Sequence, residues 1–91
     1  MWKSPKRPPQ IHLGSRQRCL IAIEHHKEYL VVEGYYLNSA EYDGTNNGND
    51  DVVTDDFTGW CHASDGNGDD GFIIENPLGW QFWPIFTKED L

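Results

Sequence analysis

The sequence predicts a mainly β protein, with a small antiparallel sheet of about five strands that is rolled or closed into a partly open barrel. Two observations support this prediction. Short runs rich in aromatic and β-branched residues recur along the chain, and clusters of Gly, Asn and Asp separate them, as turns separate strands. Helical periodicity is scarce, so the alternative α+β class would add one short helix at most.

The first two strands form the clearest element. Residues 18–24 are a short apolar run, residues 29–37 are a longer aromatic run, and a polar break lies between them. This pattern predicts an antiparallel hairpin. Gly34, within the second run, predicts a bulge or a sharp bend.

The second half of the chain alternates between strands and loops. Turn residues fill 38–56 and 63–71, which predicts two acidic loops. A brief strand at Val52 and Val53, or a helical turn after Ser39, are alternatives within the first loop. Three further strands are predicted at 57–62, 72–75 and 80–86. Pro84 predicts that the last strand lies at a sheet edge or ends there.

The length of 91 residues predicts one domain, made of a basic, Pro-rich arm at 1–17 and a β domain at 18–91. The prolines exclude a helix from the arm. We expect a flexible terminus, with Trp2 folded back onto the body. The alternative is a basic arm that contacts a polyanion.

Charge is distributed unevenly along the chain. The formal net charge is −8, but residues 1–18 hold five cations and no acid, whereas residues 41–75 hold ten acids and no Lys or Arg. Such a body repels nucleic acid and membrane phosphates and attracts basic proteins or metal cations. We therefore expect no direct nucleic-acid or membrane partner.

The sequence predicts a soluble protein of the cytoplasm. No apolar run reaches the roughly 20 residues of a membrane span, and the N-terminus does not have the apolar segment of a secretory signal. The two cysteines, Cys19 and Cys61, fit reduced thiols better than a disulfide framework.

Two kinds of metal site are conceivable, and no cofactor is predicted. Zinc ligands are present, but they are not spaced as a Cys-x-x-Cys knuckle; they are Cys19, His25, His26, Cys61 and His62. A calcium loop would begin at Asp43, with Gly48 sixth, but Thr54 stands twelfth, where a bidentate Glu belongs. Its candidate ligands are Asp43, Thr45, Asn47 and Asn49.

Catalytic chemistry finds little support in the sequence. Cys61 and His62 are neighbours, so on a strand they point to opposite faces and cannot share a proton. Phosphate-binding glycine loops and nucleophile elbows are absent from the sequence. The carboxylates cluster in solvent-rich turns, where their pKa values stay near normal and general acid catalysis is poor. The chain is therefore not expected to be an enzyme.

Several short segments follow one another along the chain: Trp2, Pro8-Pro9, the RCLIA of residues 18–22, the VEGYY of residues 32–36, Trp60 and the WPI of residues 83–85. This order resembles a family of small phage and prophage proteins of unassigned function. The family pattern is an early Trp, a Leu-Pro, a VLI strand, a GYY strand and a closing HW-x-P-LP. The chain departs from it by its acidic middle and by lacking the closing Leu-Pro-x-Pro. The resemblance implies a phage-encoded accessory domain, acting in the host cytoplasm, and supplies no catalytic residue.

The functional hypothesis that follows is binding. Carboxylates held at the spacing of backbone phosphates present the charge pattern of a nucleic acid, so an acidic face could block a host nucleic-acid-binding defence protein by mimicry. The candidate partner-binding residues are Asp50, Asp51, Asp55, Asp56, Asp65, Asp69, Asp70 and Glu75. One alternative is a phage structural module that self-assembles, as a homodimer for example, through exposed rings among Trp80, Phe82 and Trp83. Another is a calcium-stabilised binding domain.

Overall fold

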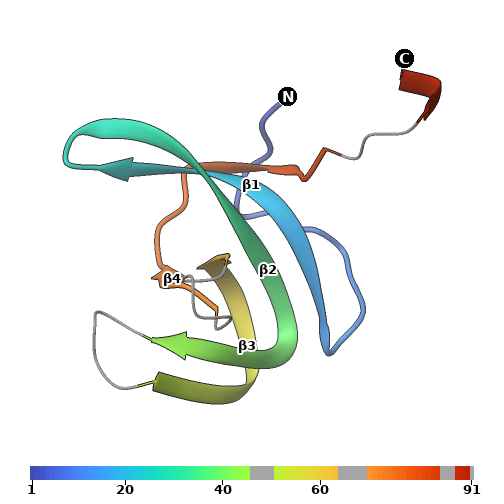
Figure 1. The fold of residues 1–91 in the computed structure, drawn as a ribbon, viewed down its shortest axis with the longest axis vertical. Helices are drawn as coiled ribbons and strands as arrows, with labels where there is room; N and C mark the ends of the chain where they lie inside the picture. The colour runs from blue at the N-terminus through green and yellow to red at the C-terminus, as the bar shows by residue number, and fades with distance from the viewer. Residues whose placement is uncertain (46–50, 64–69, 85–87, 91) are drawn as a thin grey trace.

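The computed structural model describes residues 1–45, 51–63, 70–84 and 88–90, with the backbone alone at 45, 51–55 and 90. Five strands form one open sheet in the order β4-β3-β2-β1-β5, and all neighbours are antiparallel (Figure 1). They are β1 (Ser15–His25), β2 (Glu28–Thr45), β3 (Asp51–His62), β4 (Ile73–Ile74) and β5 (Gly79–Phe82). Within the described residues, helix is limited to the 3-10 turn η1 (Lys88–Asp90). The predicted mainly β class, with about five antiparallel strands, is confirmed.

β1 and β2 form the predicted hairpin. They pair without interruption from Ser15↔Asn38 to His25↔Glu28. The two turn residues, His26 and Lys27, have left-handed φ angles of 51° and 66°. Two consecutive left-handed residues match the right-handed twist of the strands that they join, so this hairpin closes without a glycine.

β2 and β3 extend further than predicted. The sequence predicts a loop over 38–56, but β2 continues to Thr45 and β3 begins at Asp51. Asn, Asp and Gly are poor strand formers in isolation, but pairing between the two strands and burial of Tyr42 override that preference. The strand expected at Val52 and Val53 is thus present and longer, while the alternative of a helical turn after Ser39 is wrong.

β5 and the arm lie side by side at one edge of the sheet. β5 pairs with β1 from Ala22↔Gly79 to Cys19↔Phe82, and it ends two residues before Pro84. On its outer edge, Lys3 N–H donates to the Trp80 carbonyl at 2.8 Å and Trp80 N–H donates to the Lys3 carbonyl at 3.0 Å. The expected flexible arm is therefore docked on β5, and β1 begins at Ser15, within the range assigned to the arm.

Apolar side chains gather in two clusters. The first contains Cys19 and Ile21 from β1, Tyr36 from β2, Trp60 from β3 and Trp80 from β5. The second contains Leu37, Ala40 and Tyr42 from β2 and Cys61 from β3. Tyr36 pairs with Trp60 in the first cluster, while the adjacent pair Tyr35 and Cys61 belongs to the second. Because successive side chains of a strand alternate, the clusters lie on opposite faces of the sheet.

Gly34 marks a close approach rather than the predicted bulge. It pairs with Cys19 on one side and His62 on the other, and the register of β2 is regular at this point. A Cβ atom at Gly34 would overlap the Cys61 carbonyl and the Ile21 side chain. The register shifts of β2 lie between Leu37 and Ala40 and between Ala40 and Tyr42.

Candidate acidic binding surface

The outer half of the β2–β3 hairpin is turned by a backbone irregularity. Ser39 and Asp56 have left-handed φ angles of 50° and 61°, and they flank the register shift around Ala40. Ser39 N–H donates to the Thr58 hydroxyl at 2.9 Å, which satisfies a donor at the irregularity. An extra residue in one strand changes the phase of all the side chains beyond it.

That change of phase decides which side chains reach solvent. Leu37 and Tyr42 are fully buried in the same cluster. They are five positions apart, so in a regular strand they would point to opposite faces. Beyond the shift, Glu41 and Asp43 alternate with Tyr42 and are exposed. Strand residues two positions apart point the same way, so these two carboxylates share the outer face of the hairpin.

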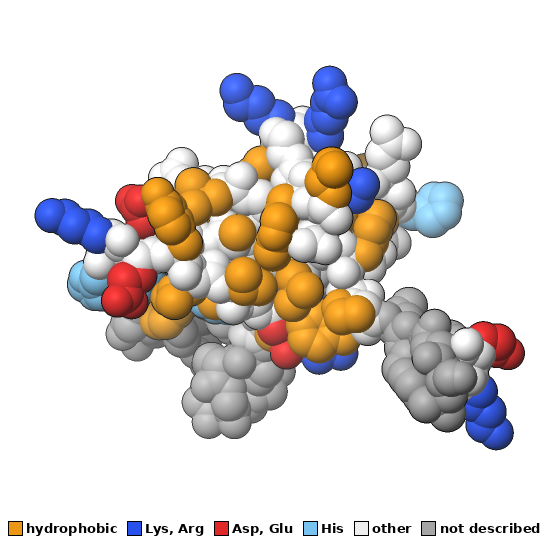
Figure 2. Space-filling view, turned by 90° about the horizontal axis from the view of Figure 1, so that it is seen from above, with side chains coloured by type: hydrophobic (Ala, Val, Ile, Leu, Met, Phe, Trp, Pro, Cys, Tyr) orange, Lys and Arg blue, Asp and Glu red, His pale blue; other side chains and the backbone are white. Residues whose placement is uncertain are grey.

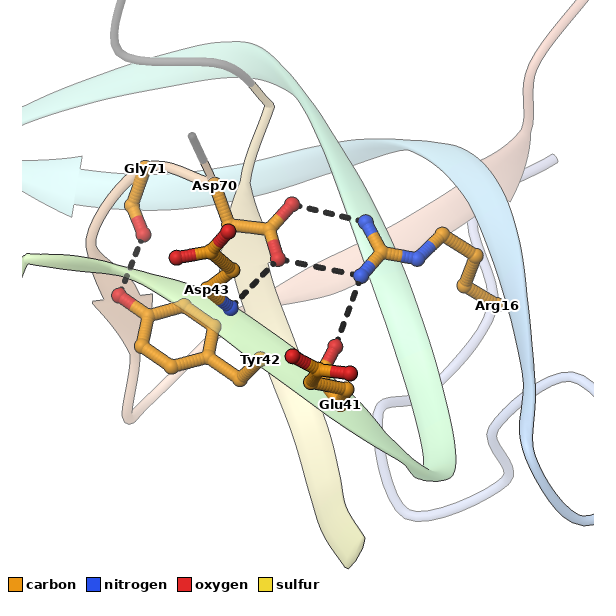
Figure 3. A network of polar contacts seen from close by, with 6 residues as sticks. All are labelled: Arg16, Glu41, Tyr42, Asp43, Asp70 and Gly71. Carbon is orange, nitrogen blue, oxygen red and sulfur yellow. Dashed lines mark hydrogen bonds and ion pairs between the residues drawn. The ribbon is translucent and has the colours of Figure 1, made fainter. Parts of the chain in front are cut away.

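A polar network ties this hairpin to β1 and to the segment after β3 (Figure 3). Arg16 donates to both carboxylate oxygens of Asp70, at 2.7 and 3.1 Å, and to the Glu41 carbonyl at 2.9 Å. Asp43 N–H donates to Asp70 Oδ2 at 3.1 Å. The Tyr42 hydroxyl donates to the Gly71 carbonyl at 2.7 Å. We call Arg16 and Asp70 the clamp, because together they join three segments.

The clamp is an ion pair with limited access to water. Asp70 is 8% exposed. Burial alone would raise the pKa of its carboxyl, but the hydrogen bonds from Arg16 and from the Asp43 amide outweigh it, so the pKa lies below its ordinary value. The hydrogen bond to Asp70 in turn raises the pKa of Arg16. Both groups are therefore charged at neutral pH, and the hairpin is held by a charge-assisted contact.

Of the predicted partner-binding residues, the three whose side chains the structure describes do not form one group. Asp56 is exposed on the hairpin, whereas Asp70 is buried in the clamp and faces Arg16. Glu75 is exposed beyond β4 and lines one shallow hollow with Lys6 of the arm and another with Glu24 of β1. Asp51 and Asp55 lie in β3, with side chains outside the description. Asp50, Asp65 and Asp69 lie outside the described residues.

The structure brings in residues that the sequence reasoning missed. Glu41 and Asp43 are the exposed acids at the far end of β2, and Arg16 balances Asp70. Alternation along β1 was a signal that Arg16 and Arg18 share a face. The separation of 54 residues between Arg16 and Asp70 left the acidic partner unpredictable.

The structure describes the five zinc candidates and two of the four calcium candidates. Asp43 belongs to the paired part of β2, as does Thr45, while Asn47 and Asn49 lie outside the description. His25 and His26 contact each other at the hairpin turn, with ring centroids 4.0 Å apart. Among the residues described, no three His, Cys, Asp or Glu side chains are placed to hold one ion.

Both cysteines are free thiols, as predicted, and they lie in different clusters. Burial raises the pKa of Cys19 to about 11 and that of Cys61 to about 12. Burial also lowers the pKa of the half-buried His62. A protonated thiol is a poor nucleophile, so neither cysteine is prepared for covalent catalysis.

The chain matches no protein-family model, curated protein or solved structure. The described part of the chain contains no helix that is long and apolar enough to cross a membrane.

Proposed function

We propose that this protein is a non-enzymatic binding domain whose acidic hairpin, the outer half of β2 and β3, blocks a nucleic-acid-binding protein by mimicking a nucleic acid. The observation that carries the proposal is the clamped hairpin itself. The clamp fixes the backbone next to Glu41 and Asp43, and the register shift turns their side chains outward.

The spacing of these carboxylates supports mimicry. Residues two positions apart on a strand are separated by about 6.8 Å, which is close to the distance between adjacent phosphates of one nucleic-acid strand. Asp56 adds a third exposed carboxylate on β3. A basic protein surface would meet these groups with Arg and Lys side chains, and charge complementarity would speed association.

The partner class is a protein with a basic nucleic-acid-binding surface. If the protein is phage-encoded, as the resemblance implies, the partner would be a host protein, such as a defence factor. The domain would compete with the nucleic acid for the same surface and would need no catalytic group of its own.

A capture experiment with paired variants tests the proposal. The immobilised protein is incubated with cell lysate, and bound proteins are eluted first with double-stranded oligonucleotide and then with salt. The test variant is Glu41→Gln/Asp43→Asn/Asp56→Asn. The matched control is Glu24→Gln/Glu28→Gln/Glu89→Gln, which removes three exposed acids outside the hairpin.

We expect a nucleic-acid-binding protein that the oligonucleotide releases, that the control retains and that the test variant loses. Retention should fall steeply between about 0.1 and 0.5 M salt, because exposed charges are screened at high ionic strength. Equal retention at both salt concentrations, or equal retention by the test variant, would contradict mimicry by this hairpin.

A further inference from the structure

Two grooves flank the docked arm. They have volumes of about 610 and 580 Å³, within the range of ligand-binding clefts. The residues that line the first groove include Trp2, Lys3, Arg7, Trp80 and Phe82. The residues that line the second groove include Lys6, Arg7, Tyr36 and Asn38. Both are lined by the four residues from Arg7 to Gln10, so this segment is a wall that the two grooves share. We call the two grooves together the arm track.

The arm track is positively charged in an acidic protein. Lys3, Lys6 and Arg7 are three of the seven Lys and Arg residues, and neither groove is lined by Asp or Glu. The N-terminus and the acidic hairpin lie at opposite ends of the view in Figure 1, whereas the second groove reaches Asn38, at the base of that hairpin. The Debye length is about 8 Å at physiological ionic strength. A ligand in the first groove, which contains no residue of the hairpin, therefore experiences Lys3 and Arg7 more strongly than the acids of the hairpin.

Aromatic rings lie beside these cations. Phe82 is 51% exposed and Trp2 is 42% exposed, so both can offer a ring surface in the first groove. The Trp80 ring packs against the Phe82 ring edge to face, with ring centroids 4.9 Å apart. Tyr36 lines the second groove but is only 9% exposed, so the exposed rings of the track, Trp2 and Phe82, both belong to the first groove, beside Lys3 and Arg7.

The track is held open by the fold. The indole N–H of Trp80 donates to the carbonyls of Ser4 and Arg7, both at 3.1 Å. Together with the Lys3 pairing, these bonds fix the arm over β5 and leave the side chains of Lys3 and Arg7 exposed. Seen from the N-terminal end, this side of the molecule shows hydrophobic side chains across its centre, with Lys and Arg projecting at the rim (Figure 2).

We propose that the arm track binds single-stranded nucleic acid, with bases stacked on the rings and phosphates held by Lys3, Lys6 and Arg7. Unstacked bases and a tracked backbone are the two features that such a surface recognises. Two grooves along one arm favour a strand over a free nucleotide, and the two exposed rings of the first groove favour nucleic acid over an acidic peptide. The net charge predicts repulsion of nucleic acid by the body, and the arm is the exception to it. The proposal does not depend on the acidic hairpin.

Fluorescence anisotropy with a labelled oligothymidine of about 12 nucleotides tests this site on the full chain. The cation variant is Lys3→Gln/Arg7→Gln, with Lys27→Gln/Lys88→Gln as its matched control. The ring variant is Phe82→Ala, with Tyr29→Ala as its control, because Tyr29 is 76% exposed, pairs with Glu24 near the β1–β2 turn and lines neither groove. Near-ultraviolet circular dichroism checks that each variant keeps its core.

We expect the oligonucleotide to bind the wild type, and we expect Phe82→Ala to weaken binding roughly tenfold, because stacking contributes about 1–3 kcal/mol per base. The cation variant should flatten the dependence of log K on log salt by about 1.4 units, which is about 0.7 for each lost cation. Both controls should bind as the wild type does.

Three results would overturn the proposal. The first is the absence of binding, or an equal loss of binding in the matched controls. The second is equal affinity for a polyglutamate peptide or for free thymidine monophosphate, which would indicate a general anion site. The third is a stable dimer in light scattering that dissociates in Phe82→Ala, which would show that a second copy covers the ring.

Discussion

Asp70 accepts hydrogen bonds from both terminal nitrogens of the Arg16 guanidinium, at 2.7 and 3.1 Å, across 54 residues of sequence. The pair connects β1 to the segment after β3. It also connects both to β2, because Arg16 donates to the Glu41 carbonyl and Asp70 accepts from the Asp43 amide. Loss of either partner therefore weakens three connections at once.

Removing one member of the clamp should destabilise the fold. Asp70→Ala removes the carboxylate that accepts from Arg16 and from the Asp43 amide, and Arg16 keeps only the Glu41 carbonyl among its described acceptors. Hydrogen bonds to charged groups contribute about 1.5–3 kcal/mol, and the partial exposure of Arg16 lowers that figure. We expect a loss of about 1–2 kcal/mol in the free energy of unfolding, measured by urea titration. A double-mutant cycle with Arg16→Ala should show coupling, and additive losses would contradict the clamp.

The clamp should also make stability depend on acid. The pKa of Asp70 is lower in the folded state than its ordinary value of 3.8. Its contribution is therefore complete above that ordinary value and is lost as the pH falls through the lower, folded value. The urea midpoint of the wild type should fall more between pH 5 and pH 2.5 than that of Asp70→Asn. Parallel pH profiles would show that Asp70 does not contribute in this way.

Gly34→Ala should be far more damaging than Gly14→Ala. A Cβ atom at Gly34 would overlap a backbone carbonyl and a fully buried Ile21, so the sheet itself must move. Gly14 has a φ of +83°, but a Cβ atom added there would meet no heavy atom within 4 Å, so its cost is conformational, about 1 kcal/mol. We expect a loss of about 3 kcal/mol or more for Gly34→Ala. Thermal melting of the two variants side by side measures the difference.

The thiols should be inert until the protein unfolds. Cys19 and Cys61 are fully buried, and burial raises their pKa values to about 11 and about 12. At pH 8 we expect a disulfide reagent such as dithionitrobenzoate to react slowly with the native protein and quickly with both thiols in urea. Fast reaction of a native thiol would show that one cluster opens readily.

The sequence predicts the fold better than it predicts the site. Residues 18–37 reveal their hairpin because apolar and aromatic strand formers surround a polar break. Ser39 and Asp56 give no comparable signal, because a left-handed residue other than glycine depends on the contacts around it. The clamp depends on the sheet register and on a return of the chain 54 residues later, which no local pattern encodes. The acids of 41–75 look uniform in sequence, but Asp70 is buried and Glu41 is exposed.

The two-sided burial of the central strands leaves their alignment open to error. Tyr35 and Tyr36, Trp60 and Cys61, and Ile73 and Ile74 are neighbours that face opposite clusters. A slip of one residue would exchange apolar groups for apolar groups, so hydrophobicity alone does not penalise the wrong alignment. Gly34 supplies the penalty, because a side chain in its place meets a backbone carbonyl. The absence of a side chain at Gly34 thus favours one pairing over the other apolar alignments.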